Sequence, residues 1–251
     1  MVDYVSKERF KRIKKLNHQK YRDYTNDCFD VLIEGEKLIH QVVLFGISLQ
    51  AIYTIEDRYK VVEKIVQNQP CPIYFLSESQ SQSLTETQTG QGIFAQVGFV
   101  TKPILHYNKL LYLNDISDPG NLGTIIRTAS SFSIDGIIID EQCCDIANSK
   151  VIRSSMGSVF AIPIMKSNKE WLEKQKCRIV VSDVHMGVSL DKYQFPKIPF
   201  ILVLGSEAKG VSESIIEIAN DRVFIPLSGK MESLNVAVAT GIFLFKTCSE
   251  K

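Results

Sequence analysis

Long apolar segments are absent from this chain of 251 residues. Its longest uninterrupted apolar runs, such as 200–204 and 242–245, are far shorter than the roughly 20 residues that cross a bilayer. No apolar stretch follows the basic residues at positions 7–15, so no secretory signal is visible. We therefore expect a soluble protein of the cytoplasm.

Cysteine and histidine are few and scattered. The six cysteines include no C-x-x-C pair, and none of the four histidines lies in a cluster with them. Isolated thiols are typical of a reducing compartment, so neither a disulfide framework nor a zinc site is expected. The chain is 45% apolar and 23% charged, which excludes a mostly disordered or low-complexity protein.

The basic residues are unevenly distributed. Residues 1–22 hold eight Lys or Arg against two acidic residues, whereas the rest of the chain holds 21 basic and 26 acidic residues. A basic arm on a mildly acidic body fits a polyanionic partner such as nucleic acid. The alternative is a first helix whose lysine-rich face is simply hydrated, and charge alone favours that alternative.

The first hundred residues predict a small mixed α/β unit. Apolar residues recur at helical spacing within 31–45 and 56–69, and 6–18 is also helix-like. The segment 77–92 is rich in Ser, Gln and Thr, which favours a short helix and an exposed loop. Strands are expected at 49–55, 73–76 and 93–100. A proline and weak periodicity place a domain linker at 101–109.

From residue 110 to the end, strands alternate with amphipathic helices. Strands that are apolar on both faces and separated by helices indicate a mostly parallel sheet with helices on both faces. The expected strands are 110–115, 136–140, 178–183, 200–204 and 222–225. The expected helices are 121–132, 148–160, 168–176, 212–220 and 233–247. In such sheets, ligands bind beyond the carboxyl ends of the strands.

The first loop at that edge leads into the helix expected at 121–132. Asn121 is a candidate N-cap, and the apolar residues after it form a stripe that would face the sheet. Arg127 lies off that stripe. Taken alone, Arg127 is as well explained as a hydrated helix residue.

The second loop, 204–215, follows the most apolar strand. Its spacing resembles a phosphate-binding P-loop, but Val211 occupies the lysine position, so an ordinary P-loop nucleotide hydrolase is not expected. No G-x-G-x-x-G follows any strand, which weakens a dinucleotide-binding interpretation. Glycines on both sides of Glu207 indicate a tight loop whose backbone approaches a small ligand, and a plain strand-to-helix turn is the alternative.

The third loop precedes an unusually apolar helix. Pro226 and Gly229 open this loop, and Ser233 is a candidate N-cap. Asn235 lies among apolar residues at the start of the helix, where an amide normally needs a hydrogen-bond partner. That partner is either structural or a bound ligand.

Together, the three loops resemble the motifs of the SpoU (TrmH-type) RNA ribose 2′-O-methyltransferases of the SPOUT class. The motifs are N-x-G-x-x-x-R at 121–127, L-G-S-E-x-x-G at 204–210 and I-P-x-x-G-x-x-x-S-L-N-V-x-V-A at 225–239. The segment 150–163 is similar to the family's R-x-S-x-G-x-x-F-x-x-P stretch. VLIEGEKLI and the Q-G-I at 91–93 resemble the beginning and end of the family's substrate-binding domain, so the similarity covers nearly the whole chain.

The resemblance implies a SPOUT methyltransferase domain at 110–251, an α/β fold whose C-terminal end forms a trefoil knot. It also implies a preceding ribosomal-protein-L30e-like domain at 1–100 that binds the RNA substrate. S-adenosylmethionine is the implied cofactor, and a homodimer through the C-terminal domain is the implied assembly. The helix 233–247 is apolar on more than one face, which fits either a partner subunit or a neighbouring helix of the same chain.

Ribosomal RNA is the substrate that the resemblance implies, because the N-terminal domain resembles that of the rRNA-directed branch. An enzyme acting on transfer RNA is the nearest alternative. A catalytically silent RNA-binding or ribosome-assembly factor is the alternative from a different class, and the intact polar motif residues speak against it.

Carried over residue by residue, the resemblance assigns chemistry to five residues: Asn121, Arg127, Glu207, Ser233 and Asn235. It assigns the cofactor pocket to six residues: Ser182, Leu204, Gly205, Ile225, Leu234 and Asn235. With the basic arm, it gives six RNA-binding candidates: Lys11, Arg12, Lys14, Lys15, Arg127 and Arg153. No metal is expected, because no cluster of metal ligands accompanies the motifs.

Arg127 is the residue on which the implied mechanism depends. A guanidinium with a pKa above ~12 is a poor base. We therefore expect Arg127 to hold the RNA phosphate and to lower the pKa of the 2′-hydroxyl, with solvent or phosphate taking the proton. Asn121 would orient Arg127, and Glu207, Ser233 and Asn235 would complete the polar rim.

Overall fold

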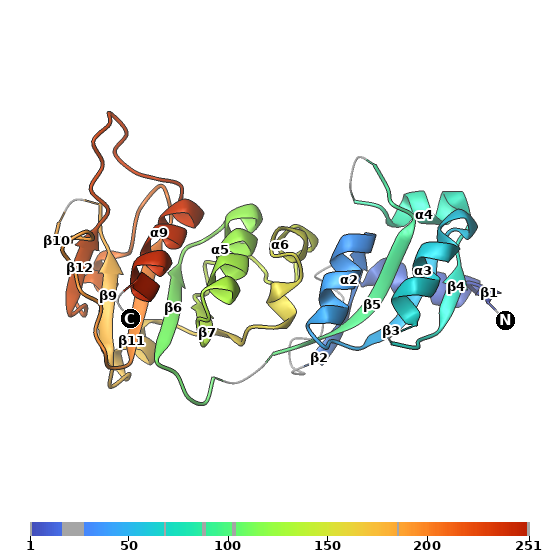
Figure 1. The fold of residues 1–251 in the computed structure, drawn as a ribbon, viewed down its shortest axis with the longest axis horizontal. Helices are drawn as coiled ribbons and strands as arrows, with labels where there is room; N and C mark the ends of the chain where they lie inside the picture. Colours follow the sequence, from blue (N-terminus) through green and yellow to red (C-terminus); the bar gives the residue numbers. More distant parts are fainter. Residues whose placement is uncertain are drawn as a thin grey trace. The chain divides into compact units, whose positions relative to one another are not determined.

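The computed structural model describes residues 2–16, 28–67, 69–86, 89–101, 104–184 and 186–249. It divides into two compact units (Figure 1). Unit 1 comprises Met1–Thr101 and Ala147–Ala161, and unit 2 comprises Lys102–Ile146 and Ile162–Lys251. None of the described helices is long and apolar enough to cross a membrane. His18 and His185 lie outside the described residues.

The described part of unit 1 is a mixed sheet with helices. Its strands are β1 (Asp3–Tyr4), β2 (Cys28–Glu34), β3 (Leu49–Thr54), β4 (Ile73–Phe75) and β5 (Ile93–Val100). Its helices include α1 (Lys7–Lys15), α2 (Glu36–Leu44), the 3-10 turn η2 (Glu56–Arg58), α3 (Tyr59–Val66) and α4 (Glu78–Leu84). The sheet order is β1-β4-β3-β5-β2, in which β5 runs antiparallel to β2 and β3 while β4 runs parallel to β3 and β1.

Helix α1 begins and packs as its sequence requires. The Ser6 hydroxyl accepts a hydrogen bond from the backbone N–H of Arg9, which makes Ser6 the N-cap. Basic residues occupy the last turn, where they complement the helix dipole. Ile13 is buried with Leu32, Tyr53 and other residues of a core cluster in this unit, so only the apolar stripe of α1 is covered.

Residues 147–161 belong to unit 1, although the chain reaches them from unit 2. They form α6 (Ser149–Ser154) and the 3-10 turn η3 (Ser158–Phe160). The Phe160 ring packs edge-on against Phe99 at 5.3 Å, and a Cβ at Gly157 would come within 2.8 Å of Val42. The sequence predicts a single helix at 148–160 inside a continuous C-terminal domain; the structure has two short pieces that pack with the N-terminal sheet.

The described part of unit 2 is an all-parallel sheet. Its strands are β6 (Lys109–Asn114), β7 (Gly136–Ile139), β8 (Ile164–Lys166), β9 (Arg178–Ser182), β10 (Val188–Ser189), β11 (Phe200–Gly205) and β12 (Asp221–Phe224). Its helices are α5 (Pro119–Ser131), α7 (Lys169–Glu173), α8 (Glu213–Ile216) and α9 (Val236–Ser249). The strand order is β10-β12-β9-β11-β6-β7-β8, and every adjacent pair is parallel.

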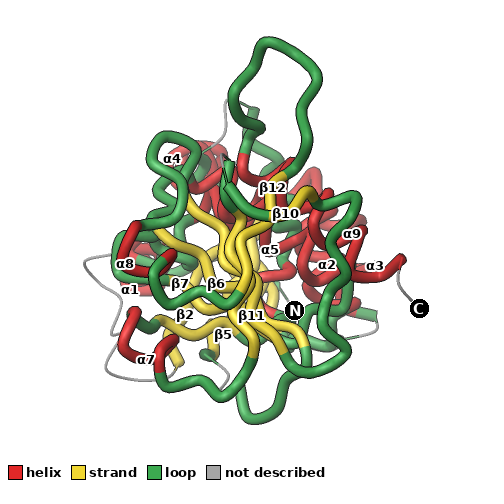
Figure 2. The backbone as a smooth tube through the Cα atoms, turned by 90° about the vertical axis from the view of Figure 1, so that its left-hand side faces the viewer, coloured by secondary structure: helices red, strands yellow, loops and turns green. Residues whose placement is uncertain are grey.

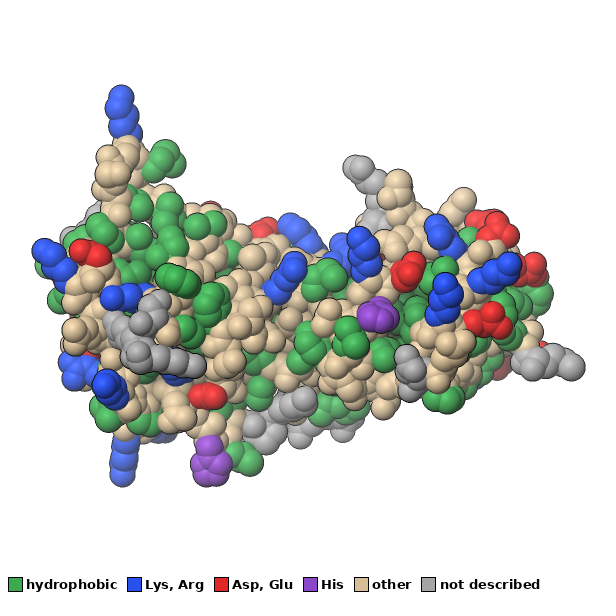
Figure 3. All heavy atoms as spheres, viewed as in Figure 1, with side chains coloured by type: hydrophobic (Ala, Val, Ile, Leu, Met, Phe, Trp, Pro, Cys, Tyr) green, Lys and Arg blue, Asp and Glu red, His purple; other side chains and the backbone are tan. Residues whose placement is uncertain are grey.

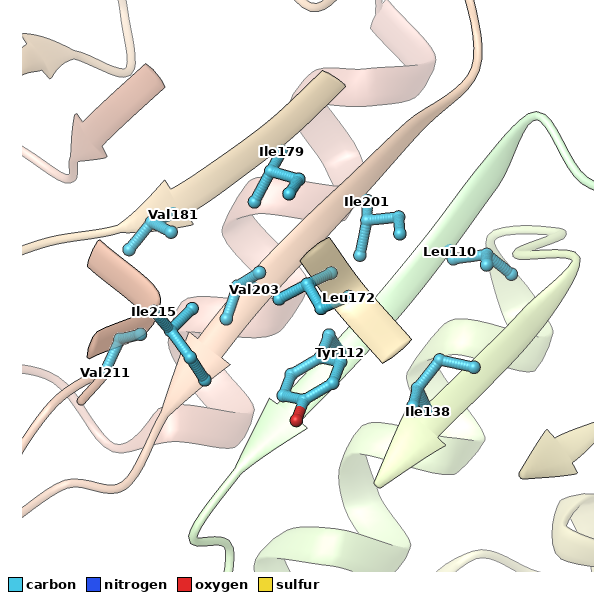
Figure 4. Close-up of a cluster of buried hydrophobic side chains, with 10 residues drawn as sticks. All are labelled: Leu110, Tyr112, Ile138, Leu172, Ile179, Val181, Ile201, Val203, Val211 and Ile215. Atoms are coloured by element: carbon cyan, nitrogen blue, oxygen red, sulfur yellow. The ribbon is translucent and has the colours of Figure 1, made fainter. Parts of the chain in front are cut away.

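Helices cover both faces of this sheet. Figure 2 shows the strands of unit 2 between α7 and α8 on one side and α5 and α9 on the other. On the α7 and α8 side, a cluster of buried side chains fills the interface (Figure 4). The cluster consists of Leu110, Tyr112, Ile138, Leu172, Ile179, Val181, Ile201, Val203, Val211 and Ile215. Because the strands bury both faces, their backbone polar groups are paired within the sheet and side-chain chemistry is confined to the strand ends.

Sequence periodicity does not predict β1, β2, β8 or β10. Three of these strands are two or three residues long, too short for an alternating pattern to register. Strand β2 runs directly into α2, and the apolar residues of both merge into the helix-like segment 31–45. The remaining expected strands of the two units are present within one or two residues of their expected ends.

Candidate functional site

Three loops meet at the carboxyl edge of the unit 2 sheet. They follow β6, β11 and β12, and two of those strands, β6 and β11, are neighbours. The chain leaves β6 toward β7 on one side and leaves β11 toward β12 on the other, so the connections from these two neighbours diverge. Such a switch point is where open α/β sheets bind ligands.

Asn121, Glu207 and Asn235, one from each loop motif, are hydrogen-bonded to one another. The Asn121 Nδ2 donates to Glu207 Oε1 at 2.7 Å, and the Asn235 Nδ2 donates to Asn121 Oδ1 at 2.9 Å. Asn235 Nδ2 also donates to Glu207 Oε1, which further accepts from the backbone N–H of Val236 at 3.3 Å. The carboxylate of Glu207 therefore ties the start of α5 to the start of α9.

Helix caps at this edge differ from the predicted ones. Asp118, not Asn121, caps α5: its Oδ1 accepts from the backbone N–H of Asn121 at 2.8 Å, and Pro119 occupies the first helical position. Asn235, not Ser233, caps α9 by accepting from the N–H groups of Ala237 and Val238 at 3.0 and 3.3 Å. Both predictions are wrong by two or three residues because an Asx or Ser side chain caps equally well from several positions.

A cavity of about 680 Å³ lies beside the polar cluster. It is lined by the ends of β9, β11 and β12 and by the loops 205–211 and 225–236. Five of the six predicted cofactor residues line it: Ser182, Leu204, Gly205, Ile225 and Leu234. The sixth, Asn235, belongs to the neighbouring hydrogen-bonded cluster instead. Glu207 and Ser233 also line the cavity, so it combines apolar walls with carboxylate and hydroxyl groups.

The loop after β11 is closed on itself. The N–H of Gly210 donates to the carbonyl of Ser206 at 2.8 Å, and Gly210 has a left-handed φ of 68°. A Cβ on Gly205 would lie 2.1 Å from the backbone of Gly210, so only glycine fits. The sequence predicts a close approach of this backbone to a ligand; the close approach in the structure is between the two ends of the loop.

Arg127 lies apart from these residues. It is exposed on α5, six residues after Asn121, and does not line the cavity. Within the described residues its guanidinium makes no ion pair, and Asn121 is bonded to Glu207 and Asn235. The predicted orientation of Arg127 by Asn121 therefore has no contact that supports it.

The predicted RNA-binding residues of unit 1 differ in their contacts with the rest of the unit. Lys11, Lys14 and Lys15 are exposed on α1. Arg12 lies 3.8 Å from Asp30, and Arg153 lies 3.4 Å from Glu86. These two arginines are therefore at least partly committed to contacts within unit 1.

Sequence reasoning missed Asn114, Asp115 and Asp140, which also lie at the carboxyl edge. Each comes at or directly after the end of a strand, and that position is the signal that could have found them. Burial, and after it the charge of Asp140, raises the pKa of the adjacent Cys143 thiol to about 12. Among the residues that the structure describes, no group of three or more His, Cys, Asp or Glu could hold a metal ion.

Comparison with known proteins identifies the class to which this fold and edge belong. The model of the SpoU rRNA methylase family matches residues 108–245, and that of the MRM3-like substrate binding domain matches residues 7–95. The chain belongs to the SpoU rRNA methylase family.

Similar proteins cover nearly the whole length of the chain. It is 31% identical over 249 residues to the 23S rRNA (guanosine(2553)-2′-O)-methyltransferase RlmP of Bacillus subtilis, covering 97% of each chain. It is 29% identical over 247 residues to an uncharacterised tRNA/rRNA methyltransferase of Synechocystis, covering 94% of this chain and 89% of the other. The AdoMet-bound rRNA methyltransferase of Sinorhizobium meliloti superimposes with a TM-score of 0.82 at 28% identity, over 98% of this chain and 97% of the other.

Proposed function

We propose that this protein transfers a methyl group from S-adenosylmethionine to a ribose 2′-hydroxyl of ribosomal RNA. The observation that carries the proposal is the cluster of Asn121, Glu207 and Asn235 beside a cavity of about 680 Å³, in a chain of the SpoU family. Ribosomal RNA is favoured over transfer RNA because the relative from Bacillus subtilis, matched over nearly its full length, is named for 23S rRNA.

The cavity fits S-adenosylmethionine in size and in chemistry. Its volume falls in the range of about 300–1,000 Å³ found for small-molecule sites. Leu204, Ile225 and Leu234 offer apolar walls for an adenine, and the carboxylates of Glu207 and Glu213 suit a cationic ligand. When bound, S-adenosylmethionine supplies an electrophilic methyl group. The protein then has to position the ribose hydroxyl and stabilise the negative charge that develops on its oxygen.

We assign Arg127 to that stabilisation, as a guanidinium that binds phosphate and withdraws charge from the 2′-oxygen. A guanidinium stays protonated at neutral pH and is therefore a poor base. Asn121, Glu207 and Asn235 have a structural role, because their hydrogen bonds hold α5, the loop after β11 and α9 in fixed positions around the cavity. Ser233 contributes a hydroxyl to the cavity wall.

We propose that the site is completed in a homodimer. The support is on α9, where Val238, Ile242 and Phe245 recur at helical spacing and are exposed, Phe245 to 66%. Figure 3 shows hydrophobic side chains gathered on the surface over α9. Helix α9 packs against α5, which carries Arg127. A partner subunit bound on α9 would therefore lie close to Arg127, which does not reach the cavity of its own subunit.

Two finer features complete the proposal. We propose a trefoil knot at the C-terminal end, supported by the path of the chain from β12 back across β9 and β11 to α5. We propose a cytoplasmic location, supported by six cysteines of which none forms a disulfide.

Methyl transfer from tritiated S-adenosylmethionine to purified rRNA and tRNA tests the function. We expect label in rRNA at a nuclease-resistant, 2′-O-methylated dinucleotide. Label in tRNA alone would move the substrate to the alternative class. RNA binding without cofactor binding would instead identify a silent assembly factor.

Hybrid dimers test the assembly. Mixing Arg127→Ala with Gly205→Ala subunits should restore activity, because one site of the mixed dimer would then have both an intact cavity and an intact arginine. Sedimentation of a fully active monomer of about 28 kDa would rule out the dimer.

A further inference from the structure

Asp140 is a buried carboxylate at the carboxyl end of β7 that has no part in the cluster described above. It is 7% exposed and accepts hydrogen bonds through both of its oxygens. Its Oδ1 accepts from the backbone N–H groups of Gln142 and Cys143, each at 3.0 Å. Its Oδ2 accepts from Asn114 Nδ2 at 2.6 Å and from the N–H of Asp115 at 3.0 Å.

Asn114 links Asp140 to the loop after β11, because it is hydrogen-bonded to both. Its side chain, also buried at 8% exposure, accepts from the backbone N–H of Ser212 through Oδ1 at 2.8 Å. Ser212 stands where the loop ends and α8 begins. The residues just before it, from Ser206 to Val211, all line the cavity.

A carboxylate can only accept hydrogen bonds, whereas an amide both donates and accepts. Asp140 therefore dictates which way the Asn114 amide faces: its NH₂ must point to Asp140, and its oxygen is left for Ser212. We propose that Asp140 is a positioning residue for the cofactor-binding loop 206–212, acting through the orientation of Asn114. This inference rests on the proposed binding of S-adenosylmethionine.

The backbone and side chain of Asp115 independently support a connection between these strand ends and the loop after β11. Asp115 is a non-glycine residue with a left-handed φ of 60°, and its N–H is held by Asp140. Its carboxylate lies 3.1 Å from Lys209 Nζ, again in the loop after β11. The ends of β6 and β7 thus contact that loop through a side-chain amide and through an ion pair.

Substituting Asp140→Asn keeps the shape of the side chain and turns one of its acceptors into a donor. If the new amide keeps its oxygen toward Gln142 and Cys143, its NH₂ faces the NH₂ of Asn114. Turning Asn114 over relieves that conflict but points its NH₂ at the N–H of Ser212. A donor is left without an acceptor in either case, and burial makes this costly.

The double variant Asn114→Asp with Asp140→Asn restores the order of donors and acceptors from β7 through β6 to Ser212, and only the N–H of Asp115 still faces a donor. An aspartate side chain on β6 accepts from the new amide on β7 through one oxygen and from Ser212 through the other. A role of Asp140 confined to its own turn predicts no benefit from a change of Asn114. Rescue by the double variant therefore distinguishes positioning of the loop from local stabilisation.

Asp135→Asn is the matched control. Asp135 lies directly before β7, as Asp140 lies directly after it, and its Oδ2 accepts from the N–H groups of Asn108 and Lys109 at 2.7 and 2.9 Å. It thus bridges the same two strands at the opposite edge, away from the cavity. Its substitution should alter stability without altering cofactor affinity.

Titration calorimetry with S-adenosylmethionine tests the proposal on full-length protein. We expect Asp140→Asn to raise Kd by about tenfold, the double variant to recover to within about threefold of the parent, and Asp135→Asn to leave Kd unchanged. Parent affinity in Asp140→Asn, or a double variant as weak as Asp140→Asn, would overturn the inference. Absence of binding in the parent protein would instead refute the proposed function.

Hydrogen exchange tests the inference on the parent protein alone, so it does not depend on whether any variant folds. The N–H of Ser212 has Asn114 Oδ1 as its partner, so we expect it to exchange as slowly as the amides of β11. Exchange at the rate of an exposed loop would show that Asn114 does not hold the loop, and would overturn the inference in the same way.

Discussion

The two sheets of this protein treat polar groups in opposite ways. In unit 2 the sheet faces are dry, and the polar side chains collect at the carboxyl edge, where Asn121, Glu207 and Asn235 meet. In unit 1 a polar network lies on the sheet itself. Gln96 donates to Asp30 at 2.7 Å and accepts from the Tyr53 hydroxyl at 3.0 Å.

Helix α1 extends the unit 1 network outward. The Arg9 guanidinium lies 4.2 Å above the ring of Tyr74, and Arg12 approaches Asp30. Arginine heads therefore anchor the inner side of α1, and lysines remain on the outside. The sheet of unit 2 is thus a rigid frame, which positions a site at its carboxyl edge. The sheet of unit 1 is a platform, which holds the basic helix α1 through polar contacts.

Gly205→Ala should have the largest effect on cofactor affinity, because it disturbs the end of β11, where the cavity loop begins. A Cβ there would lie 2.1 Å from the Gly210 backbone, and backbone cannot move aside as a flexible side chain can. We expect loss of S-adenosylmethionine binding by more than about 100-fold, with the circular dichroism of the fold retained. Gly229→Ala is the control, since no atom lies within 4 Å of a Cβ at that position. Parent affinity in Gly205→Ala would mean that the loop does not form the cavity wall.

Arg127→Ala should come next and should leave the frame intact. Because Arg127 is exposed and outside the cavity, its loss should lower kcat about 10²–10³-fold while the Kd for S-adenosylmethionine stays unchanged. Arg127→Lys keeps the charge without the planar fork and should recover part of the rate. Weakened cofactor binding in Arg127→Ala would contradict the assignment.

Gln96→Ala tests the platform instead of the edge. Removing the amide leaves the buried Tyr53 hydroxyl without its acceptor and takes a donor away from Asp30, which should lower the free energy of unfolding by about 2–3 kcal/mol. Cofactor affinity should not change, because the network lies wholly in unit 1. Gln50→Ala, at the exposed end of the same network, should cost less. Chemical denaturation measured beside calorimetry separates the two effects.

The contrast between the units also explains what the sequence could predict. The strands of unit 2 are apolar runs bounded by turns, and such runs locate β6, β7, β9 and β11 within a residue or two. The motifs predict that Asn121, Glu207 and Asn235 belong to one site, and the structure brings them together. Their mutual hydrogen bonds join residues up to 114 positions apart, and no local pattern reports such a contact.

Other features depend on long-range packing in the same way. Segment 147–161 joins unit 1 because Gly157 and Phe160 fit against Val42 and Phe99, far away in the sequence. Asp140 and Asn114 carry no motif, and only the strand ends on which they lie bring them together. The sequence misplaces the caps of α5 and α9 because several Asx and Ser residues near each helix start could cap it equally well.

The outer side of α1 should give the smallest effect and the sharpest test of the platform. Lys11 and Lys14 are exposed, whereas Arg12 is close to Asp30, so the two lysines are the ones placed to contact RNA phosphates. Lys11→Glu with Lys14→Glu should weaken RNA binding and reduce the slope of log Kd against log salt by about 0.7 for each phosphate that is no longer neutralised. Lys60→Glu with Lys64→Glu, on α3, changes the same charge in the same unit and should leave the slope as it is. Equal slopes in both pairs of variants would show that α1 presents only a hydrated face, and the platform would then have to hold RNA through another surface of unit 1.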